Sequence, residues 1–245
     1  MYSELLAGYV PGMLHSGELF WRDHCEWLQQ TGYQLRPRYQ PDWTPSWIGT
    51  EKLWFRCEDA ASPHHYKIVD ARRISDGARM ILKRYNKSVH PHEAEIAQFF
   101  SSGELRSKPQ NHCVQIHDVL SVPGEDNEVV LVMPELRAFD DPEFDTIGEI
   151  LEFFRQLFEG VRFMHQHHVA HRDLSCMNVM MDASEMYIDP YHPFSPADKL
   201  DFTGRARHHT RTQKPVKYYI LDFGLSRKYA ASSLPALELP IFGGG

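Results

Sequence analysis

Two short stretches decide the fold of this chain: His171-Arg172-Asp173-Leu174-Ser175-Cys176-Met177-Asn178 and Asp222-Phe223-Gly224. The first follows residues 146–168, whose apolar side chains recur at i, i+3 and i+4 and predict a long amphipathic helix. The second ends an apolar run that reads as a strand. We therefore expect a helix, a polar loop and a later strand that together present two aspartates and an asparagine.

Upstream of this helix the pattern predicts a small sheet. Five short runs rich in β-branched or aromatic residues suggest strands: residues 53–58, 67–73, 78–85, 113–122 and 128–136. Turn-forming residues separate the second run from the third and the fourth from the fifth. Between the third and fourth of these runs, residues 90–100 have helical spacing. The expected unit is thus a sheet of five strands with one helix.

The N-terminal region is unusually aromatic, because all five tryptophans lie within the first 54 residues. Residues 18–30 have the pattern of a short amphipathic helix, and three prolines after residue 36 then favour an extended backbone. We interpret the aromatic residues as anchors that tie an N-terminal extension, residues 1–52, to the next domain. The alternative is an exposed docking surface for a partner.

Composition and charge exclude several classes of protein. The 245 residues carry a net charge of −7, so we expect no general attraction to nucleic acid. No apolar run approaches the roughly 20 residues of a membrane-spanning helix. The start of the sequence lacks a secretory signal, and the four cysteines form neither a CxxC pair nor a dense framework. We expect free thiols and an intracellular protein, cytoplasmic or nuclear and not secreted.

The motifs, in this order, resemble those of the protein kinase superfamily. Residues 171–178 match the HRDLxxxN catalytic loop, Asp222-Phe223-Gly224 matches the magnesium motif, and Met80-Ile81-Leu82-Lys83 ends a strand as the family's lysine motif does. The resemblance covers about residues 53–228. Within the superfamily the sequence is most similar to the kinase-like proteins of mushroom-forming fungi, in residues 20–43, 148–182 and 211–229.

This resemblance implies an α+β, bilobal protein-kinase-like fold. Residues 53–136 would form the small lobe, with a five-stranded sheet and one helix. Residues 137–228 would form part of a mainly helical lobe, with an insertion at 183–216. Residues 229–245 would be a truncated tail, so we expect the sequence to be incomplete at its C-terminal end.

The resemblance also implies ATP and Mg²⁺ as cofactors and assigns roles to four residues. Phosphoryl transfer depends on positioning and on stabilising spread negative charge. Asp173 would take or orient the proton of the acceptor hydroxyl, and Lys83 would contact the α and β phosphates. Asn178 and Asp222 would hold Mg²⁺, since hard oxygen ligands suit a hard cation.

Further positions would hold the lysine or the adenine ring. A carboxylate on the helix after the lysine strand normally pairs with that lysine. Glu93 and Glu95 both qualify, and we choose Glu95 because the Ile-x-x-Phe-Phe pattern after it resembles the family's core-facing pattern. The adenine ring is expected to meet four residues: Met133 at the gatekeeper position, the Pro134 carbonyl, the Leu136 backbone, and Met180 as the floor.

Three departures from the family pattern bear on activity. Residues 58–65 contain no glycine, although glycine lets backbone amides approach phosphates, and Asp59 would repel them. Ser175 stands where serine/threonine kinases usually place lysine, and small-molecule phosphotransferases of this fold share that feature. The sequence stops 21 residues after Gly224. We therefore expect the helix at 146–168 to expose apolar surface, which a partner could cover.

The insertion is the remaining feature. Asp173 and Asp222 lie 49 residues apart, which leaves about 30 residues beyond the family spacing. This region carries a group of basic side chains beside His208 and His209: Arg205, Arg207, Arg211, Lys214 and Lys217. They could form a dock for an anion or phosphopeptide, but we favour a solvated, disordered loop.

Three hypotheses about function follow. The first is an ATP- and Mg²⁺-dependent phosphotransferase of protein-kinase type, acting on Ser or Thr more than on Tyr of a protein substrate. The second is a catalytically weak or inactive pseudokinase that works as a scaffold. The third, which rests on Ser175, is a small-molecule kinase.

Overall fold

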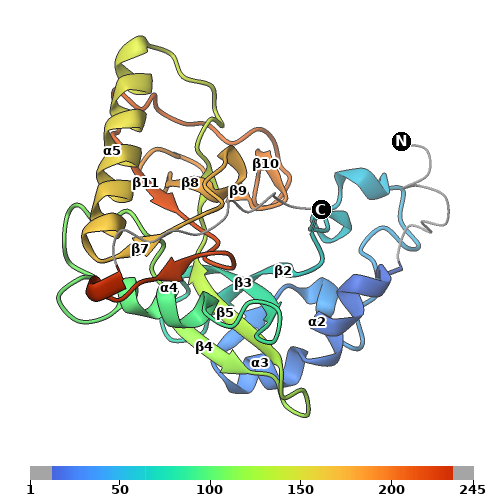
Figure 1. Cartoon of the computed structure of the whole chain (residues 1–245). Helices are drawn as coiled ribbons and strands as arrows, with labels where there is room; N and C mark the ends of the chain where they lie inside the picture. The colour runs from blue at the N-terminus through green and yellow to red at the C-terminus, as the bar shows by residue number, and fades with distance from the viewer. Residues whose placement is uncertain (1–12, 64, 234–245) are drawn as a thin grey trace, which may run out of the picture. The chain divides into compact units, whose positions relative to one another are not determined.

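The computed structural model describes residues 13–63 and 65–233 (Figure 1). These residues fall into two units. The first unit contains the described residues up to Lys83 together with Asp189–Arg207, and the second contains Arg84–Ile188 and the residues from His208 onward. Within these described residues no helix has the length and apolar character needed to cross a membrane.

A five-stranded sheet runs in the order β1-β2-β3-β5-β4. Its strands are β1 (Tyr33–Leu35), β2 (Ile68–Arg73), β3 (Arg79–Asn86), β4 (Asp118–Ser121) and β5 (Glu128–Pro134). The pairs β1–β2, β2–β3 and β4–β5 are antiparallel. Helix α4 (Glu93–Ser101) connects β3 to β4. The predicted fold class, α+β with five strands and one helix in this part, is confirmed.

The first predicted strand, residues 53–58, is wrong. Those residues form the 3₁₀ turns η3 (Trp54–Arg56) and η4 (Glu58–Ala60). Leu53 and Phe55 are 51% and 55% exposed and only Cys57 of this run is buried, so its apolar side chains form no continuous buried face. The fifth strand is instead β1, where Tyr33 and Leu35 are buried on either side of exposed Gln34. A segment assigned to the N-terminal extension therefore supplies an edge strand of the sheet.

The N-terminal segment folds as expected into short helices, and it is part of the core of the first unit. After η1 (Ser16–Glu18) come α2 (Leu19–Asp23) and α3 (Cys25–Gln30), and α3 packs against β1. Trp21 is fully buried, and its indole N–H donates to the Tyr66 carbonyl at 2.8 Å. Trp21 and Trp47 thus act as anchors, whereas Trp54 is 37% exposed.

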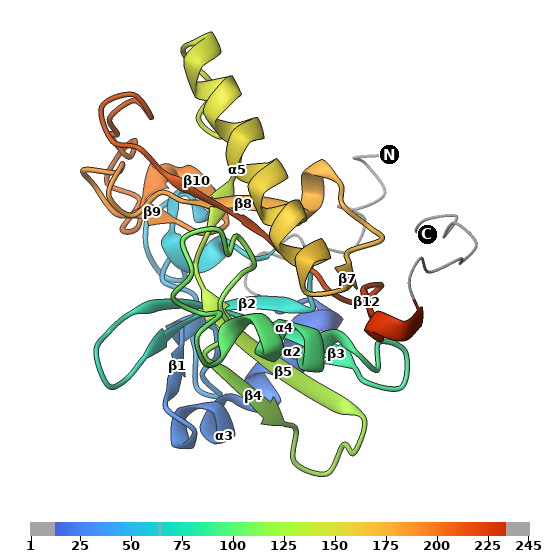
Figure 2. The same ribbon diagram turned by 60° about the vertical axis from the view of Figure 1, so that its left-hand side comes forward.

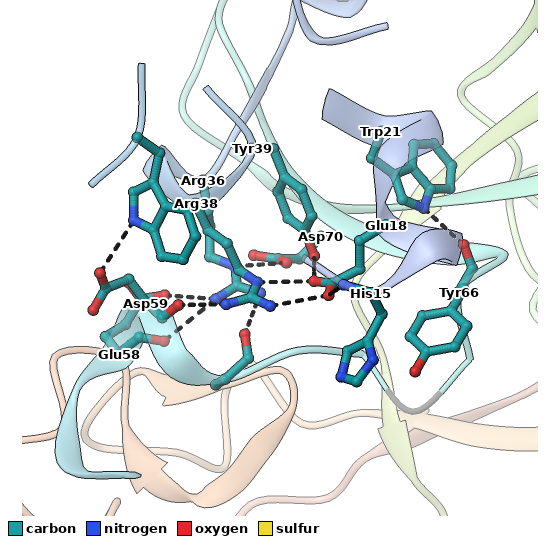
Figure 3. Close-up of polar contacts among 12 residues, drawn as sticks. His15, Glu18, Trp21, Arg36, Arg38, Tyr39, Glu58, Asp59, Tyr66 and Asp70 are labelled. Carbon is teal, nitrogen blue, oxygen red and sulfur yellow. Dashed lines mark hydrogen bonds and ion pairs between the residues drawn. The ribbon is translucent and has the colours of Figure 1, made fainter. Parts of the chain in front are cut away.

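A fully buried ion pair holds this segment. The Arg38 guanidinium donates from Nε to Glu18 Oε1 at 2.8 Å and from Nη2 to Glu18 Oε2 at 2.9 Å. Figure 3 shows the two side chains facing each other. Arg38 lies in the 3₁₀ turn η2 (Pro37–Tyr39), and neither side chain of the pair is exposed to solvent. Two desolvated charges are tolerated only because each is hydrogen-bonded to the other.

The middle of the insertion belongs to the first unit and is ordered. It forms a hairpin of β9 (Tyr191–His192) and β10 (Ser195–Lys199). Buried His192 lies 3.1 Å from Glu58 Oε1, and Glu58 in turn accepts a hydrogen bond from Arg36 Nη1 at 2.9 Å. The Arg79 guanidinium donates to the Tyr191 carbonyl and stacks over its ring. These contacts fix the hairpin to the segment between β1 and β2 and to the start of β3.

The second unit is built around α5 (Ile147–Gln166), which lies along β11 (Figure 2). Thr146 caps α5 by accepting the Glu149 N–H. Besides α4, β4 and β5, this unit contains β6 (Arg137–Ala138), β7 (Val169–Ala170), η5 (Cys176–Asn178), β8 (Val179–Asp182), β11 (Lys217–Ile220), β12 (Arg227–Lys228) and η6 (Ala231–Ser233). Strands β11, β8 and β6 form a three-stranded sheet, and β12 pairs with β7.

One side of α5 packs on this sheet, and the other side is exposed and apolar. The exposed stripe comprises Ile147, Leu151, Phe154 and Phe158, which are between 43% and 76% exposed. These residues recur at i, i+4, i+7 and i+11 and therefore form one continuous face. The apolar exposure expected for this helix is present in the described residues.

Candidate active site

The predicted catalytic loop leaves α5 through β7 and ends in η5, directly before β8. Strand β8 pairs antiparallel with β11, and Val179 is the partner of Ile220. Asn178 immediately precedes Val179, and Asp222 lies two residues after Ile220. The Leu221 N–H also donates to the Asn178 carbonyl at 2.9 Å. The β8–β11 pair therefore brings Asn178 and Asp222 to the same end of one ladder.

Asp173 and Asn178 are joined directly. The Asn178 side-chain amide donates to the Asp173 carbonyl at 2.7 Å and to its Oδ2 at 3.2 Å. These two bonds hold the loop between the residues in a closed turn. They also use the Asn178 side-chain nitrogen, which leaves its amide oxygen as the atom that could meet a cation.

His171 acts as a structural bridge under this loop. It is buried, its Nε2 lies 2.8 Å from the Leu221 carbonyl, and its Nδ1 accepts the Asp173 N–H at 3.3 Å. A carbonyl only accepts and an amide N–H only donates, so both contacts fit the neutral tautomer with a proton on Nε2. His171 thus connects the catalytic loop to the residue before Asp222.

Two residues of the site adopt left-handed backbone conformations. Arg172 has φ of 69° and Asp222 has φ of 64°, which non-glycine residues rarely adopt. Each such residue costs roughly 1–3 kcal/mol and tends to occur where geometry is set by function. The turn at Asp222 is supported by the Gly224 N–H, which donates to Asp222 Oδ1 at 3.3 Å.

Phe223 anchors the turn after Asp222 in the core of the second unit. Its side chain is only 1% exposed. The ring lies 5.6 Å from that of His171 and 6.3 Å from that of Phe100, measured between centroids. The turn is therefore packed between the catalytic loop and α4.

The residues predicted to bind adenine lie at the end of β5, just before β6 and in β8, all within the second unit. Met133 and Pro134 end β5, and Leu136 precedes β6. In the pairing of β6 with β8, Ala138 is opposite Met180. Met133 and Leu136 are buried, while Pro134 and Met180 are half-buried. The structure thus places Met180 on the strand that pairs with β6, and β6 directly follows the segment 133–136.

The choice between Glu93 and Glu95 is changed by the structure. Glu95 has a side chain that is 70% exposed and lies 3.5 Å from His92, whereas Glu93 is only 2% exposed. Glu93 shares the buried face of α4 with Ile96, Ala97 and Phe100, at spacings of three, four and seven. This spacing is visible in the sequence, and the geometry favours Glu93. Lys83 lies in β3 opposite Ile68 and ends the first of the two stretches that make up the first unit.

Asp59 does not have the role expected for it in repelling phosphate. It is buried and accepts three hydrogen bonds, from Ser46 N–H at 2.8 Å, Ser46 Oγ at 2.6 Å and Trp43 Nε1 at 3.1 Å. Its carboxylate therefore stabilises the fold of the segment between β1 and β2. That segment contains the turns η2, η3 and η4 in place of a short glycine-rich loop.

Three of the basic residues of the insertion contact other groups of the protein. Arg207 pairs with Asp189 at 2.7 Å and Arg205 with Asp198 at 3.7 Å. Arg211 is buried, donates to the carbonyls of Phe139, Pro142 and Glu143, and stacks over Phe144. The hairpin and these contacts show that the insertion is not the disordered loop that the sequence favoured.

The residues present fit a magnesium ion bound together with a nucleotide. Among residues 13–63 and 65–233, no group of three or more His, Cys, Asp or Glu could hold a metal alone. Mg²⁺ in phosphoryl-transfer sites is usually held by one or two carboxylates together with substrate phosphates. The Asp222 carboxylate and the Asn178 amide oxygen are hard ligands of this type.

Comparison with known proteins gives a consistent result. Residues 81–236 match the family described as protein tyrosine and serine/threonine kinase. The protein is 27% identical over 128 residues to human NUAK family SNF1-like kinase 2, covering 49% of this sequence and 20% of that protein. It is 31% identical over 115 residues to the serine/threonine-protein kinase CAK1 of Saccharomyces cerevisiae, covering 44% of this sequence and 24% of that protein.

A third relative shows the same limits of coverage. The match to the serine/threonine-protein kinase pim-2 of Danio rerio is 25% identical over 134 residues, and it covers 47% of this sequence and 43% of that protein. The matched region thus spans a fifth to less than half of the length of these relatives. Residues 1–80 lie outside the matched family range.

Proposed function

Because the chain belongs to the protein tyrosine and serine/threonine kinase family, we propose that it is a phosphotransferase that uses ATP and Mg²⁺ and acts on serine or threonine hydroxyls of a protein. The observation that carries this proposal is the hydrogen-bonded pair Asp173–Asn178 beside the ladder end that holds Asp222. The relatives named as serine/threonine-protein kinases support the choice of acceptor. An intracellular location remains a prediction from the sequence.

Each residue of the pair has a separate role in this proposal. Asp173 orients the acceptor hydroxyl and takes its proton, and the Asn178 amide keeps the Asp173 carboxylate in place. Asp222 and the Asn178 amide oxygen hold Mg²⁺, which neutralises charge on the phosphates. Met133, Pro134, Leu136 and Met180 surround the adenine.

Lys83 is proposed to contact the α and β phosphates and to be held by Glu93. Glu93 is buried on α4, and a buried carboxylate requires a cation or several donors. Glu95, which is exposed, offers a matched control on the same helix. In this proposal Glu93→Gln lowers transfer and Glu95→Gln leaves it unchanged.

A second candidate function, a scaffold with weak or no catalysis, is favoured by two observations. The segment between β1 and β2 is a series of 3₁₀ turns that contains no short glycine-rich loop. The exposed stripe of α5 offers an apolar face to a partner or to further polypeptide. A small-molecule kinase is a third candidate, which rests on Ser175 in the catalytic loop.

The decisive experiment measures transfer from labelled ATP with Mg²⁺ to a mixture of peptides and to small hydroxyl compounds. The variants are Asp173→Ala and Asp222→Asn, and the control is Asp126→Asn, a carboxylate in the β4–β5 turn. Loss of about 10²-fold or more in the first two variants, with the control unchanged, supports the enzyme.

Other outcomes separate the candidates. Transfer only to small compounds supports the third candidate. No transfer, combined with no thermal stabilisation by ATP and Mg²⁺, supports the scaffold. Transfer that is equal in all variants would overturn the assignment of the site.

A further inference from the structure

The turn before α4 reaches the turn that contains Asp222. His90 Nδ1 lies 3.2 Å from the Gly224 carbonyl oxygen, although the two residues are 134 positions apart in the sequence. Since a carbonyl can only accept, the His90 Nδ1–H donates this hydrogen bond. Both residues belong to the second unit.

The His90 ring also occupies the space beside Gly224. A Cβ on residue 224 would lie 2.9 Å from His90 Nδ1, 3.3 Å from His90 Cγ and 3.2 Å from Asp222 Oδ1. Distances below about 3.0 Å are not compatible with undisturbed packing. Glycine is therefore required at position 224 by the imidazole and the carboxylate together.

His90 is itself held from two sides. Its backbone N–H donates to the Asn86 carbonyl at 3.0 Å at the end of β3, and its carbonyl accepts the Glu93 N–H at 3.3 Å at the start of α4. The Asn86 side chain donates to Glu128 of β5 at 2.8 Å. The turn is thus anchored to the sheet, and this fixes the backbone from which the His90 imidazole projects.

From these contacts we infer that His90 is a positioning residue for the metal-binding aspartate. His90 holds the Gly224 carbonyl, and the Gly224 N–H holds Asp222 Oδ1 at 3.3 Å. These two hydrogen bonds in series connect the start of α4 to the Asp222 carboxylate. The left-handed backbone of Asp222, with φ of 64°, needs such support because it is not the conformation this residue prefers. The inference rests on the proposed role of Asp222 in holding Mg²⁺.

The first test compares the Mg²⁺ dependence of nucleotide binding between the parent protein and three variants. This measurement does not require catalytic activity. Thermal unfolding with ADP is recorded over a series of Mg²⁺ concentrations for the parent and for His90→Ala, His90→Asn and His92→Ala. His90→Ala should raise the Mg²⁺ concentration for half-maximal stabilisation about 2- to 10-fold, as expected for one lost hydrogen bond, with ADP binding in the absence of Mg²⁺ unchanged.

The other two variants show whether the hydrogen bond is responsible. In His90→Asn the side-chain amide nitrogen can occupy the place of Nδ1, so this variant should recover most of the loss. His92→Ala is the matched control, because His92 lies on the same turn beside exposed Glu95. Equal effects of His90→Ala and His90→Asn, or an effect of His92→Ala as large as that of His90→Ala, would overturn the inference.

A second test examines the contact itself, whether or not the protein binds nucleotide. Gly224→Ala should lower the melting temperature, and the double variant His90→Ala/Gly224→Ala should lose less than the two single changes added together. Additive losses would show that the imidazole does not restrict residue 224. If the parent shows no Mg²⁺-dependent binding and Asp222→Asn changes nothing, the proposed function fails. If Asp222→Asn abolishes Mg²⁺-dependent binding but His90→Ala has no effect, only the positioning role fails.

Discussion

Replacement of Arg38 by methionine should strongly destabilise the first unit. Arg38 and Glu18 are both completely buried, and the guanidinium also donates to the Asp59 carbonyl at 2.9 Å. In Arg38→Met the Glu18 carboxylate would keep only the His15 N–H at 2.9 Å and the Tyr39 hydroxyl at 3.3 Å as donors. Breaking a buried pair on one side costs about 3–5 kcal/mol. At about 2–4 °C per kcal/mol for a protein of this size, the melting temperature should fall by about 6–20 °C.

Two controls make this prediction specific, and circular dichroism during heating measures all of them. Glu18→Gln/Arg38→Met removes both charges and should be more stable than Arg38→Met alone, because no unpaired charge remains buried. Arg155→Met breaks an exposed pair with Glu152 and should cost less than about 1 kcal/mol. If Arg38→Met loses no more stability than Arg155→Met, the buried pair does not hold the N-terminal segment.

The remaining predictions concern pH, a thiol and a glycine. Burial alone would raise the pKa of Glu58, but the hydrogen bond from His192 and nearby arginine charge outweigh it, so that this pKa lies below its usual range. The resulting stabilisation is present above the unfolded-state pKa of about 4.3 and is lost as the pH falls below it. In Glu58→Gln the melting temperature should therefore decline less steeply in acid than in the parent. An equally steep decline would contradict this. Cys176 is exposed and the other three cysteines are buried, so mass spectrometry should find a thiol reagent on Cys176 in the folded protein and on the others only after denaturation. Gly17→Ala would make its Cβ clash with the Tyr66 side chain and should lower the free energy of unfolding in denaturant by about 1–3 kcal/mol. An unchanged unfolding midpoint would show that this contact is absent.

The local elements of the fold could be predicted where their signals are strong and contiguous. Helix α5 has both a threonine cap and a long apolar period, and its predicted range of 146–168 differs from Ile147–Gln166 by one or two residues. The strand predicted at 53–58 is wrong because aromatic and β-forming residues suggest a strand even where no partner strand buries them. Strand β1 is not predicted, because three residues are too few to show a clear alternation of apolar and polar side chains.

The site could be predicted in part for the same reason. Asp173, Asn178 and Asp222 belong to two short motifs, and each motif is contiguous in the sequence. The structure joins Asp173 to Asn178 by hydrogen bonds and brings Asn178 and Asp222 to the same end of the β8–β11 ladder. Glu93 could have been preferred over Glu95 from its spacing to Ile96 and Phe100. The contacts of His90 and His192 link residues 134 positions apart, and no pattern in a single sequence indicates such pairs.

The hairpin of the insertion has a consequence for how the protein can be divided. Since Asp189–Arg207 folds with the residues up to Lys83, the polypeptide passes between the two units three times. A fragment that ends at Lys83 would lack His192 beside Glu58 and Tyr191 beside Arg79. The first unit is therefore not a contiguous segment that can be expressed or fused by itself. A fragment designed to contain it would have to include both stretches of the polypeptide.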